Sequence, residues 1–263
     1  MIGGSIGLRA RGAGARTIGY DERAENAERA RDRGALDRVA PAVAECFEAD
    51  VLVLATPLEA TLTLLDGLGR NPPRASLVMD VCSVKAPVAR AGRGLESFVP
   101  SHPMSGSEQS GPQAARADLF VGCVWMYAPA ATSAVEGARA FIHSMGARPL
   151  ALDPAEHDRI VALTSHLPQL LSVALGTRLG ERLGETGVAE LCGPGMRSML
   201  RLGSSSCPVW RGVLAANAGA VSQEVRGLVA ILTEFARALE AGEVQTLAPA
   251  FAEAARAVQR LNE

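Results

Sequence analysis

Four polar segments of the sequence carry residue types suited to acid–base chemistry and anion binding. They are Thr56-Pro57, DVCSVK (80–85), SHPMSGSEQSG (101–111) and SHLPQ (165–169). The first three each follow an apolar run with the composition of a strand, and in an open parallel sheet ligands bind beyond the carboxyl ends of the strands. An unperturbed histidine titrates near neutral pH and can act as a base, while serine and glutamine exchange hydrogen bonds. The spacing predicts that these segments converge on one cleft.

A glycine-rich segment, MIGGSIGLRARGAGARTIGYD, opens the chain. It reads as the second half of a dinucleotide-binding loop, with a helix that starts at the glycines and a strand that ends at an acidic residue. We expect Gly3, Gly4 and Ser5 to border the cofactor phosphates. Asp21 favours NAD over NADP because a carboxylate repels a 2′-phosphate, and the nearby Arg23 is the one feature that favours NADP. We interpret Met1 as an internal methionine, preceded by about ten further residues that form a strand and G-x-G.

Strand-like and helical runs alternate up to residue 150, which predicts an α/β fold: a Rossmann-like doubly wound parallel sheet whose first strand is apparently missing. DVLVLAT and SLVMDVCS have the apolar composition of strands buried on both faces, and CVWMYAP that of an edge strand. The predicted strands are ARTIGYD (15–21), DVLVLAT (50–56), SLVMDVCS (76–83), SFVPSHPM (97–104) and CVWMYAP (123–129), with helices over 22–34 and 57–68.

The pattern changes after ARPLALD (147–153), where helical periodicity replaces strands. We therefore predict a dinucleotide-binding domain over 1–151 and a helical substrate and dimerisation domain over 152–263. The run from Pro208 to Gly242 is apolar on more than one helical stripe, and such helices need partners beyond the core of a monomer. The sequence thus predicts a homodimer formed through the C-terminal helices.

Composition narrows the classes of protein further. The chain has 263 residues, 48% of them hydrophobic, and a net charge of −2, so it can build a large core and has no basic patch for nucleic acid. No uninterrupted apolar run approaches the ~18 residues of a membrane span, and no secretory signal pattern is present, so we expect a cytoplasmic protein with no membrane partner. The five cysteines are scattered and never spaced C-x-x-C, which predicts neither a disulfide framework nor a metal site.

Taken together, the motifs resemble those of the prephenate and arogenate dehydrogenases of tyrosine biosynthesis. The resemblance covers nearly the whole chain in order, and HPMSGSEQSG together with SHLP is its most specific part. It implies an oxidoreductase that uses NAD for the oxidative decarboxylation of prephenate, a small-molecule substrate, to 4-hydroxyphenylpyruvate. The matching pieces are IGGS (2–5), GYD (19–21), ATPLEAT (55–61), DVCSVK (80–85), HPMSGSEQSG (102–111), SHLPQ (165–169), GPGMRSMLRL (193–202) and PVWRGVL (208–214).

The resemblance also implies roles for individual residues. His102 would be the catalytic base, Ser83 would orient it or the substrate hydroxyl, and Arg201 would bind a substrate carboxylate through its planar guanidinium. Further substrate-binding residues would be His166, Gln169, Trp210 and Glu108, and further cofactor-binding residues Thr56 and Pro57.

Several alternatives stay open at this point. Arogenate carries an ammonium group where prephenate carries a keto group, and the neutral Gln169 favours prephenate; an amino-substituted prephenate would suit the same motifs. The incomplete glycine loop also suits a truncated, inactive family member. His166 lies two positions before Pro168 and could support a helix kink there instead of binding substrate. His157 is expected to make local hydrogen bonds, and Lys85 either neutralises charge near the cofactor or lies on the surface.

Overall fold

A computed structural model describes residues 1–106, 111–129, 133–205 and 207–262. The chain divides into two compact units, Met1–Asn217 and Ala218–Glu263. This division by contacts does not test the predicted domain boundary near residue 151, which remains a prediction.

The strands of the first unit form three small sheets. β1 pairs with β2, β3–β4–β5 form a parallel sheet, and β6–β7–β8 form a mixed sheet in which β6 is antiparallel to β7. No strand pairing between described residues joins one sheet to another. The bounds are β1 Ile18–Gly19, β2 Arg38–Val39, β3 Val51–Leu54, β4 Leu77–Asp80, β5 Phe98–Val99, β6 Ser101–Pro103, β7 Val124–Tyr127 and β8 Arg148–Ala151.

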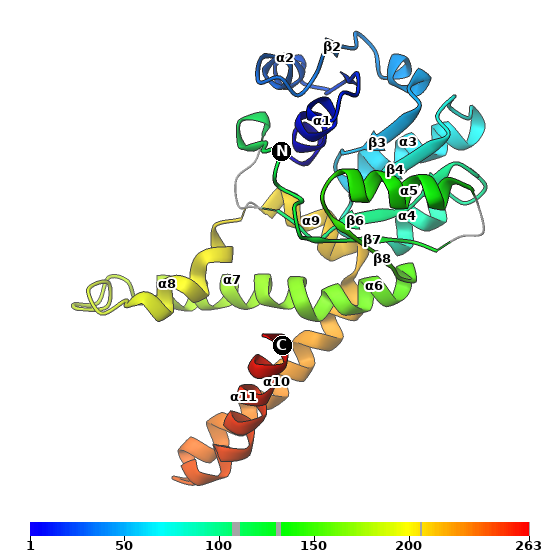
Figure 1. The fold of residues 1–263 in the computed structure, drawn as a ribbon. Helices are drawn as coiled ribbons and strands as arrows, with labels where there is room; N and C mark the ends of the chain where they lie inside the picture. The colour runs from blue at the N-terminus through cyan, green and yellow to red at the C-terminus, as the bar shows by residue number, and fades with distance from the viewer. Residues whose placement is uncertain (107–110, 130–132, 206, 263) are drawn as a thin grey trace. The chain divides into compact units, whose positions relative to one another are not determined.

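Along the chain, the helices of the first unit precede, separate and follow these strands (Figure 1). They are α1 Ile2–Gly12, α2 Ala24–Asp32, α3 Leu58–Arg70, α4 Ala86–Ala91, α5 Ser133–Ser144, α6 Pro154–Val161, α7 Leu167–Gly180, α8 Pro194–Leu200 and α9 Cys207–Ala216.

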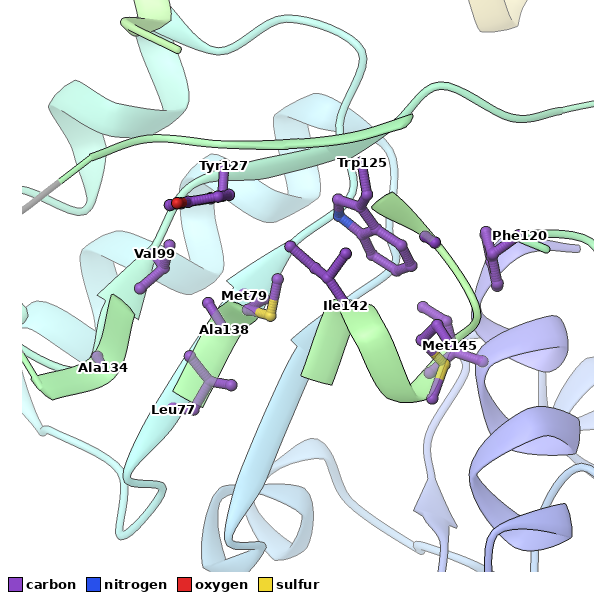
Figure 2. Close-up of a cluster of buried hydrophobic side chains, with 12 residues drawn as sticks. Leu77, Met79, Val99, Phe120, Trp125, Tyr127, Ala134, Ala138, Ile142 and Met145 are labelled. Carbon is purple, nitrogen blue, oxygen red and sulfur yellow. The ribbon is translucent and has the colours of Figure 1, made fainter. Parts of the chain in front are cut away.

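Strand β4 separates two hydrophobic clusters, and its residues alternate between them. Leu77 and Met79 join Ile6 of α1 and Ile142 of α5 in one cluster, where Figure 2 shows side chains from β4, β7 and α5 pointing toward one another. Val78 joins α3 and α4 side chains in the other. Helices therefore cover both faces of the parallel sheet, which confirms the doubly wound α/β class predicted from the sequence.

Two strand predictions were wrong. SFVPSHPM is not one strand: β5 and β6 belong to different sheets and are separated by Pro100, which has no backbone N–H to donate to a ladder. CVWMYAP is not an edge, because β7 lies between β6 and β8 with Trp125 fully buried. The apolar run of β3 is also less enclosed than expected, since Val51 is 38% exposed at the start of the strand.

Helix α6 continues into α7 through one π-helical turn, η3, over Ala162–His166. Pro168 follows this turn and cannot donate a hydrogen bond to the preceding carbonyls, which explains the local widening of the helix. The run Pro154–Gly180 is long and apolar enough to cross a membrane by length and composition, with a mean hydropathy of 1.3. It also carries buried polar side chains that are hydrogen-bonded to other parts of the same unit, as expected of a packing helix.

The second unit consists of α10 Ala218–Glu240, the short 3₁₀ turn η5 Val244–Leu247 and α11 Ala248–Leu261. The turn contacts both helices. Of the described residues in this unit, only Val221 and Ala238 are buried.

Candidate active site

A buried ion pair ties the end of β4 to the start of β6. The Lys85 ammonium donates to the Asp80 carboxylate, and both side chains are fully buried. Asp80 also accepts hydrogen bonds from the backbone N–H groups of Cys82 and Ser101, both at 2.9 Å. Lys85 Nζ donates to the Ser101 carbonyl at 2.6 Å. Because a buried charge is tolerated only when paired and hydrogen-bonded, this network fixes the backbone directly before His102.

His102 lies in β6 and is partly buried. Its Nδ1 is 3.0 Å from Nε2 of His157, and the two rings meet edge to face with centroids 5.2 Å apart. Burial lowers the pKa of His102 well below its usual value, and the charge of Lys85 and the neighbouring His157 and His166 lower it further. His102 is therefore an unprotonated ring that can accept a proton.

His157 and Asp158 connect His102 to α4. His157 Nδ1 lies 2.8 Å from Asp158 Oδ1. The same carboxylate accepts the backbone N–H groups of Lys85 at 2.7 Å and Ala86 at 2.8 Å, which lie at the start of α4 and have no partner within that helix. The helix α6 is itself held by Asp153, whose side chain caps its first turn. Asp158 therefore links the loop after β4 to the histidine that contacts His102.

His166 is buried at the end of η3, where Asn217 Nδ2 lies 3.3 Å from His166 Nδ1 and donates to the Asp158 carbonyl at 2.7 Å. The rings of His166 and Trp210 meet edge to face with centroids 5.8 Å apart. Burial lowers the pKa of His166, Asp158 opposes that shift, and His157 adds to it. His166 and Trp210, predicted as substrate residues, are thus neighbours.

Gln169 and Arg201, both predicted to bind substrate, differ in exposure: Gln169 is buried and Arg201 is exposed. Gln169 is buried and donates from Nε2 to the Leu202 carbonyl at 2.8 Å, so it holds the 3₁₀ turn η4 (Arg201–Ser204) against α7. Arg201 begins this turn, and its side chain is exposed. Among the described residues, no acidic side chain forms an ion pair with the Arg201 guanidinium. An exposed guanidinium of this kind can bind an anion from solvent.

Helix α1 begins near the carboxyl ends of the strands. A Cβ on Gly3 would lie 3.0 Å from Cβ of Ala55, which directly follows β3, and one on Gly7 would lie 2.3 Å from the Ala35 carbonyl oxygen. Only glycines allow this close approach. The first helical hydrogen bond runs from Ser5 N to the Met1 carbonyl, which leaves the Gly3 and Gly4 amides free of helical partners. Such amides at a helix start suit a phosphate.

Ser5 is engaged within the protein: its Oγ is fully buried and accepts the Arg116 N–H at 3.0 Å. Asp21 is exposed just beyond β1, and its Oδ1 accepts hydrogen bonds from Arg23 N at 2.9 Å and Asn26 Nδ2 at 3.1 Å. This arrangement of exposed carboxylate and helix start suits an adenosine ribose and its phosphates.

Thr56 and Pro57 lie at the start of α3, with Pro57 at the N-cap. Thr56 Oγ1 is 2.8 Å from Thr61 Oγ1, and the Cys82 thiol donates to Thr61 Oγ1 at 3.3 Å. Burial raises the pKa of Cys82 to about 11, so this cysteine is a neutral thiol at physiological pH. The loops after β3 and β4 are thus joined side by side.

Ser83 is half-buried in the loop between β4 and Lys85, and Glu108 lies outside the described residues. His102 and His166 interact electrostatically, and His157 lowers the pKa of both. His157 makes local hydrogen bonds as expected, whereas the surface alternative for Lys85 was wrong because its side chain is fully buried against Asp80. The structure also reveals polar residues that the sequence analysis did not single out: Asp80, Asp158 and Asn217. The signal that could have found Asp80 and Lys85 is their position within DVCSVK, at a strand end.

A doubly wound sheet with a glycine-rich helix start at the strand ends, followed by helices that carry a buried histidine cluster, defines a dinucleotide-binding protein. The family models "Prephenate dehydrogenase, nucleotide-binding domain" and "Prephenate dehydrogenase, dimerization domain" match residues 5–150 and 153–253, respectively. The chain therefore belongs to the prephenate dehydrogenase family.

Curated relatives agree with this assignment. The chain is 33% identical over 230 residues to a prephenate dehydrogenase of Bacillus subtilis, covering 82% of this chain but 62% of that protein's length. It is 28% identical over 263 residues to a prephenate dehydrogenase of Lactococcus lactis, covering 96% of this chain and 73% of the relative. The crystal structure of prephenate dehydrogenase from Aquifex aeolicus has the same fold, with a TM-score of 0.89 at 22% identity over 100% of this chain and 96% of that one.

Proposed function

We propose that this protein is an NAD-dependent prephenate dehydrogenase, which converts prephenate to 4-hydroxyphenylpyruvate in tyrosine biosynthesis. The observation that carries the proposal is His102, an unprotonated histidine whose Nδ1 meets His157 and whose preceding residue, Ser101, is bound by the Asp80–Lys85 ion pair, in a chain of this family. The Bacillus subtilis and Lactococcus lactis relatives bear the same activity in their names.

The reaction needs the groups that this site supplies. Prephenate carries a ring hydroxyl opposite a quaternary carbon that bears a carboxylate. The hydroxyl proton moves to His102, and the bond between the quaternary carbon and the carboxylate breaks to release carbon dioxide. The electron pair of that bond makes the ring aromatic, and the resulting phenolate oxygen takes the proton back from His102. NAD, when bound, would supply the acceptor for the hydride that leaves the carbon bearing the hydroxyl. Ser83 would orient His102 or that hydroxyl.

The depressed pKa of His102 keeps the base in its neutral form before substrate binds. Prephenate brings two carboxylates, and negative charges near a histidine favour its protonated form. Substrate binding would therefore raise the pKa of His102 as the proton transfer begins. We assign Arg201, with its exposed guanidinium, to one of these carboxylates. His166, Gln169, Trp210 and Glu108 complete the proposed substrate set.

For the cofactor, we assign the amides of Gly3 and Gly4 to the phosphates and Asp21 to the ribose hydroxyls, with Ser5, Thr56 and Pro57 beside them. The amides at the start of α1, which lack helical partners, and the exposed Asp21 carboxylate support this assignment. The Aquifex aeolicus enzyme has been solved in complex with hydroxyphenyl propionate and NAD+. Asp21 is the reason to favour NAD over NADP.

We further propose that residues 1–151 bind the dinucleotide and that residues 152–263 bind substrate and form a homodimer. The exposed apolar side chains of α10 and α11 and the dimerization-domain match over 153–253 support the dimer. A biosynthetic enzyme of this kind would act in the cytoplasm.

The direct test follows all three products after prephenate and excess NAD are added to the purified protein. We expect NADH, carbon dioxide and 4-hydroxyphenylpyruvate in equal amounts, with slower turnover on NADP. Parallel assays with arogenate distinguish the two substrates, because arogenate would yield tyrosine. Turnover of arogenate alone would overturn the substrate assignment, and a folded dimer that neither binds NAD nor turns over either substrate would overturn the enzyme assignment.

A further inference from the structure

Three side chains, those of His102, His157 and Asp158, form a linear hydrogen-bonded chain. His102 Nδ1 lies 3.0 Å from His157 Nε2, and His157 Nδ1 lies 2.8 Å from Asp158 Oδ1. His157 is 2% exposed and Asp158 is 5% exposed, so water has little access to either side chain. The chain connects β6 to α6.

The hydrogen positions in this chain follow from what each atom can donate or accept. Asp158 accepts two backbone N–H groups, from Lys85 and Ala86, and an ionised carboxylate has no hydrogen to donate. His157 must therefore carry its hydrogen on Nδ1. In a neutral His157 ring, Nε2 is then an acceptor, and His102 must carry its hydrogen on Nδ1 to donate to it. That leaves Nε2 of His102 as the nitrogen that can take a proton.

We propose that His157, backed by Asp158, is a positioning residue that fixes the tautomer of His102 and stabilises its protonated form. This inference rests on the proposed role of His102 as the base. The proton of the substrate hydroxyl would bind Nε2 of His102, and the resulting imidazolium would still donate from Nδ1 to His157. The proton then returns from Nε2 to the phenolate oxygen of the aromatic product, which restores the neutral ring of His102. His157 itself does not contact the substrate.

Other charged groups around the chain are Lys85 with its partner Asp80, next to His102, and His166, next to His157 and Asp158. Asp158 also has a structural task, because it accepts both amides at the start of α4 and its carbonyl accepts the Asn217 amide. Substituting Asp158 would therefore combine two effects. His157 offers the cleaner test, since its side chain bonds to His102 and Asp158 within this same chain of groups.

The first experiment measures tautomers without any need for activity. The sequence contains four histidines, so ¹⁵N-histidine labelling gives a spectrum that single substitutions can assign. We expect His102 to be protonated at Nδ1 and unprotonated at Nε2 in the wild-type protein, and to shift toward the Nε2-protonated form in His157→Phe. A wild-type His102 protonated at Nε2 would overturn the proposal, whether or not the protein turns over prephenate.

The second experiment compares kcat and KM across variants. His157→Phe removes the acceptor and should lower kcat about 10- to 100-fold with KM within about twofold, the range typical of partners that orient a functional histidine. His157→Gln keeps an oxygen that can accept from His102 and should recover part of the loss. His143→Gln, on the exposed surface of α5, is the matched control and should leave kcat unchanged.

The pH profile separates this role from a structural one. His157→Phe should change the acid limb of the kcat profile, because the protonated form of His102 loses its acceptor, while the melting temperature stays near that of wild type. Equal losses in both His157 variants that follow their melting temperatures, or an unchanged kcat in His157→Phe, would overturn the proposal. An inactive wild-type protein with the expected tautomers would instead count against the proposed function alone.

Discussion

The polar cluster around His102 and the helix pair α10–α11 differ in how far their side chains are buried and partnered within the chain. In the cluster, Asp80, Lys85, His157 and Asp158 are all buried, and each has hydrogen-bond partners within Met1–Asn217. In the helix pair, large apolar side chains remain exposed: Val229, Ile231, Leu232, Leu239, Phe251, Val258 and Leu261.

This contrast indicates that proton transfer and dimerisation depend on different parts of the chain. A buried ionic network whose members are paired is preorganised, so the residues proposed for catalysis need no other element to set their geometry. A helix pair with large exposed apolar side chains is suited to a partner, because covering them removes apolar surface from water. We therefore assign the proton transfer to the first unit and dimerisation to the second. Substitutions in each unit test that division.

The largest effect is expected at His102. His102→Asn removes the base and should lower kcat by about 10²- to 10⁴-fold, the usual contribution of general acid–base catalysis. Steady-state NADH formation with prephenate measures it, and circular dichroism should report an unchanged fold. His143→Asn provides the control. A His102→Asn protein that retains wild-type kcat would remove the base from this cluster.

The next effect concerns the buried ion pair. Lys85→Met leaves the Asp80 carboxylate buried without its cation, which should lower the free energy of unfolding by about 3–5 kcal/mol. Urea unfolding measures the loss. The double variant Asp80→Asn, Lys85→Met removes both charges and should be more stable than Lys85→Met alone. If the single variant matches wild type in stability, the pair is not the support for β6 that the structure indicates.

A smaller effect is expected for the helix pair. Leu232→Asp places a charge on the exposed apolar surface and should raise the dimer Kd at least about tenfold, because burying an unpaired carboxylate costs more than the ~1.4 kcal/mol that a tenfold change requires. Gln223→Glu adds the same charge on the polar side of α10 and is the control. Analytical ultracentrifugation measures both. Equal Kd values for the two variants would exclude this surface from the dimer interface.

The smallest effect is on stability as pH falls. The pKa values of His102 and His166 are lowered in the folded protein, so both rings bind protons at lower pH there than in the unfolded chain, where they bind protons below about pH 6.5. Stability should be fully present above that pH and fall below it, by at most about 1.4 kcal/mol per pH unit for each histidine. Urea unfolding at about pH 7.5 and about pH 5.5, on either side of that value, tests the sign. His166→Asn should reduce the slope and His143→Asn should not; a slope that His166→Asn leaves intact would contradict the assignment.

The sequence predicted the α/β class because strand and helix patterns are local: Leu77, Val78 and Met79 of β4 are apolar and buried as expected. It did not predict that Pro100 divides one apolar run between two sheets, or that β7 is a central strand, since pairing partners are set by tertiary contacts. The same limit applies to the site. The predicted His102 lies beside His157, 55 positions away in the chain, and spacing alone does not reveal such a contact.

The most direct test of the central claim is a side-by-side assay of the wild-type protein and His102→Asn, in which the initial rate of NADH formation is measured at saturating NAD and prephenate. We predict clear turnover by the wild-type protein, and a rate lower by about 10²-fold or more in a variant that still binds NAD and remains dimeric. Equal rates in the two proteins, or a folded wild-type protein that binds NAD and prephenate but forms no NADH, would contradict the assignment of His102 as the base of a prephenate dehydrogenase.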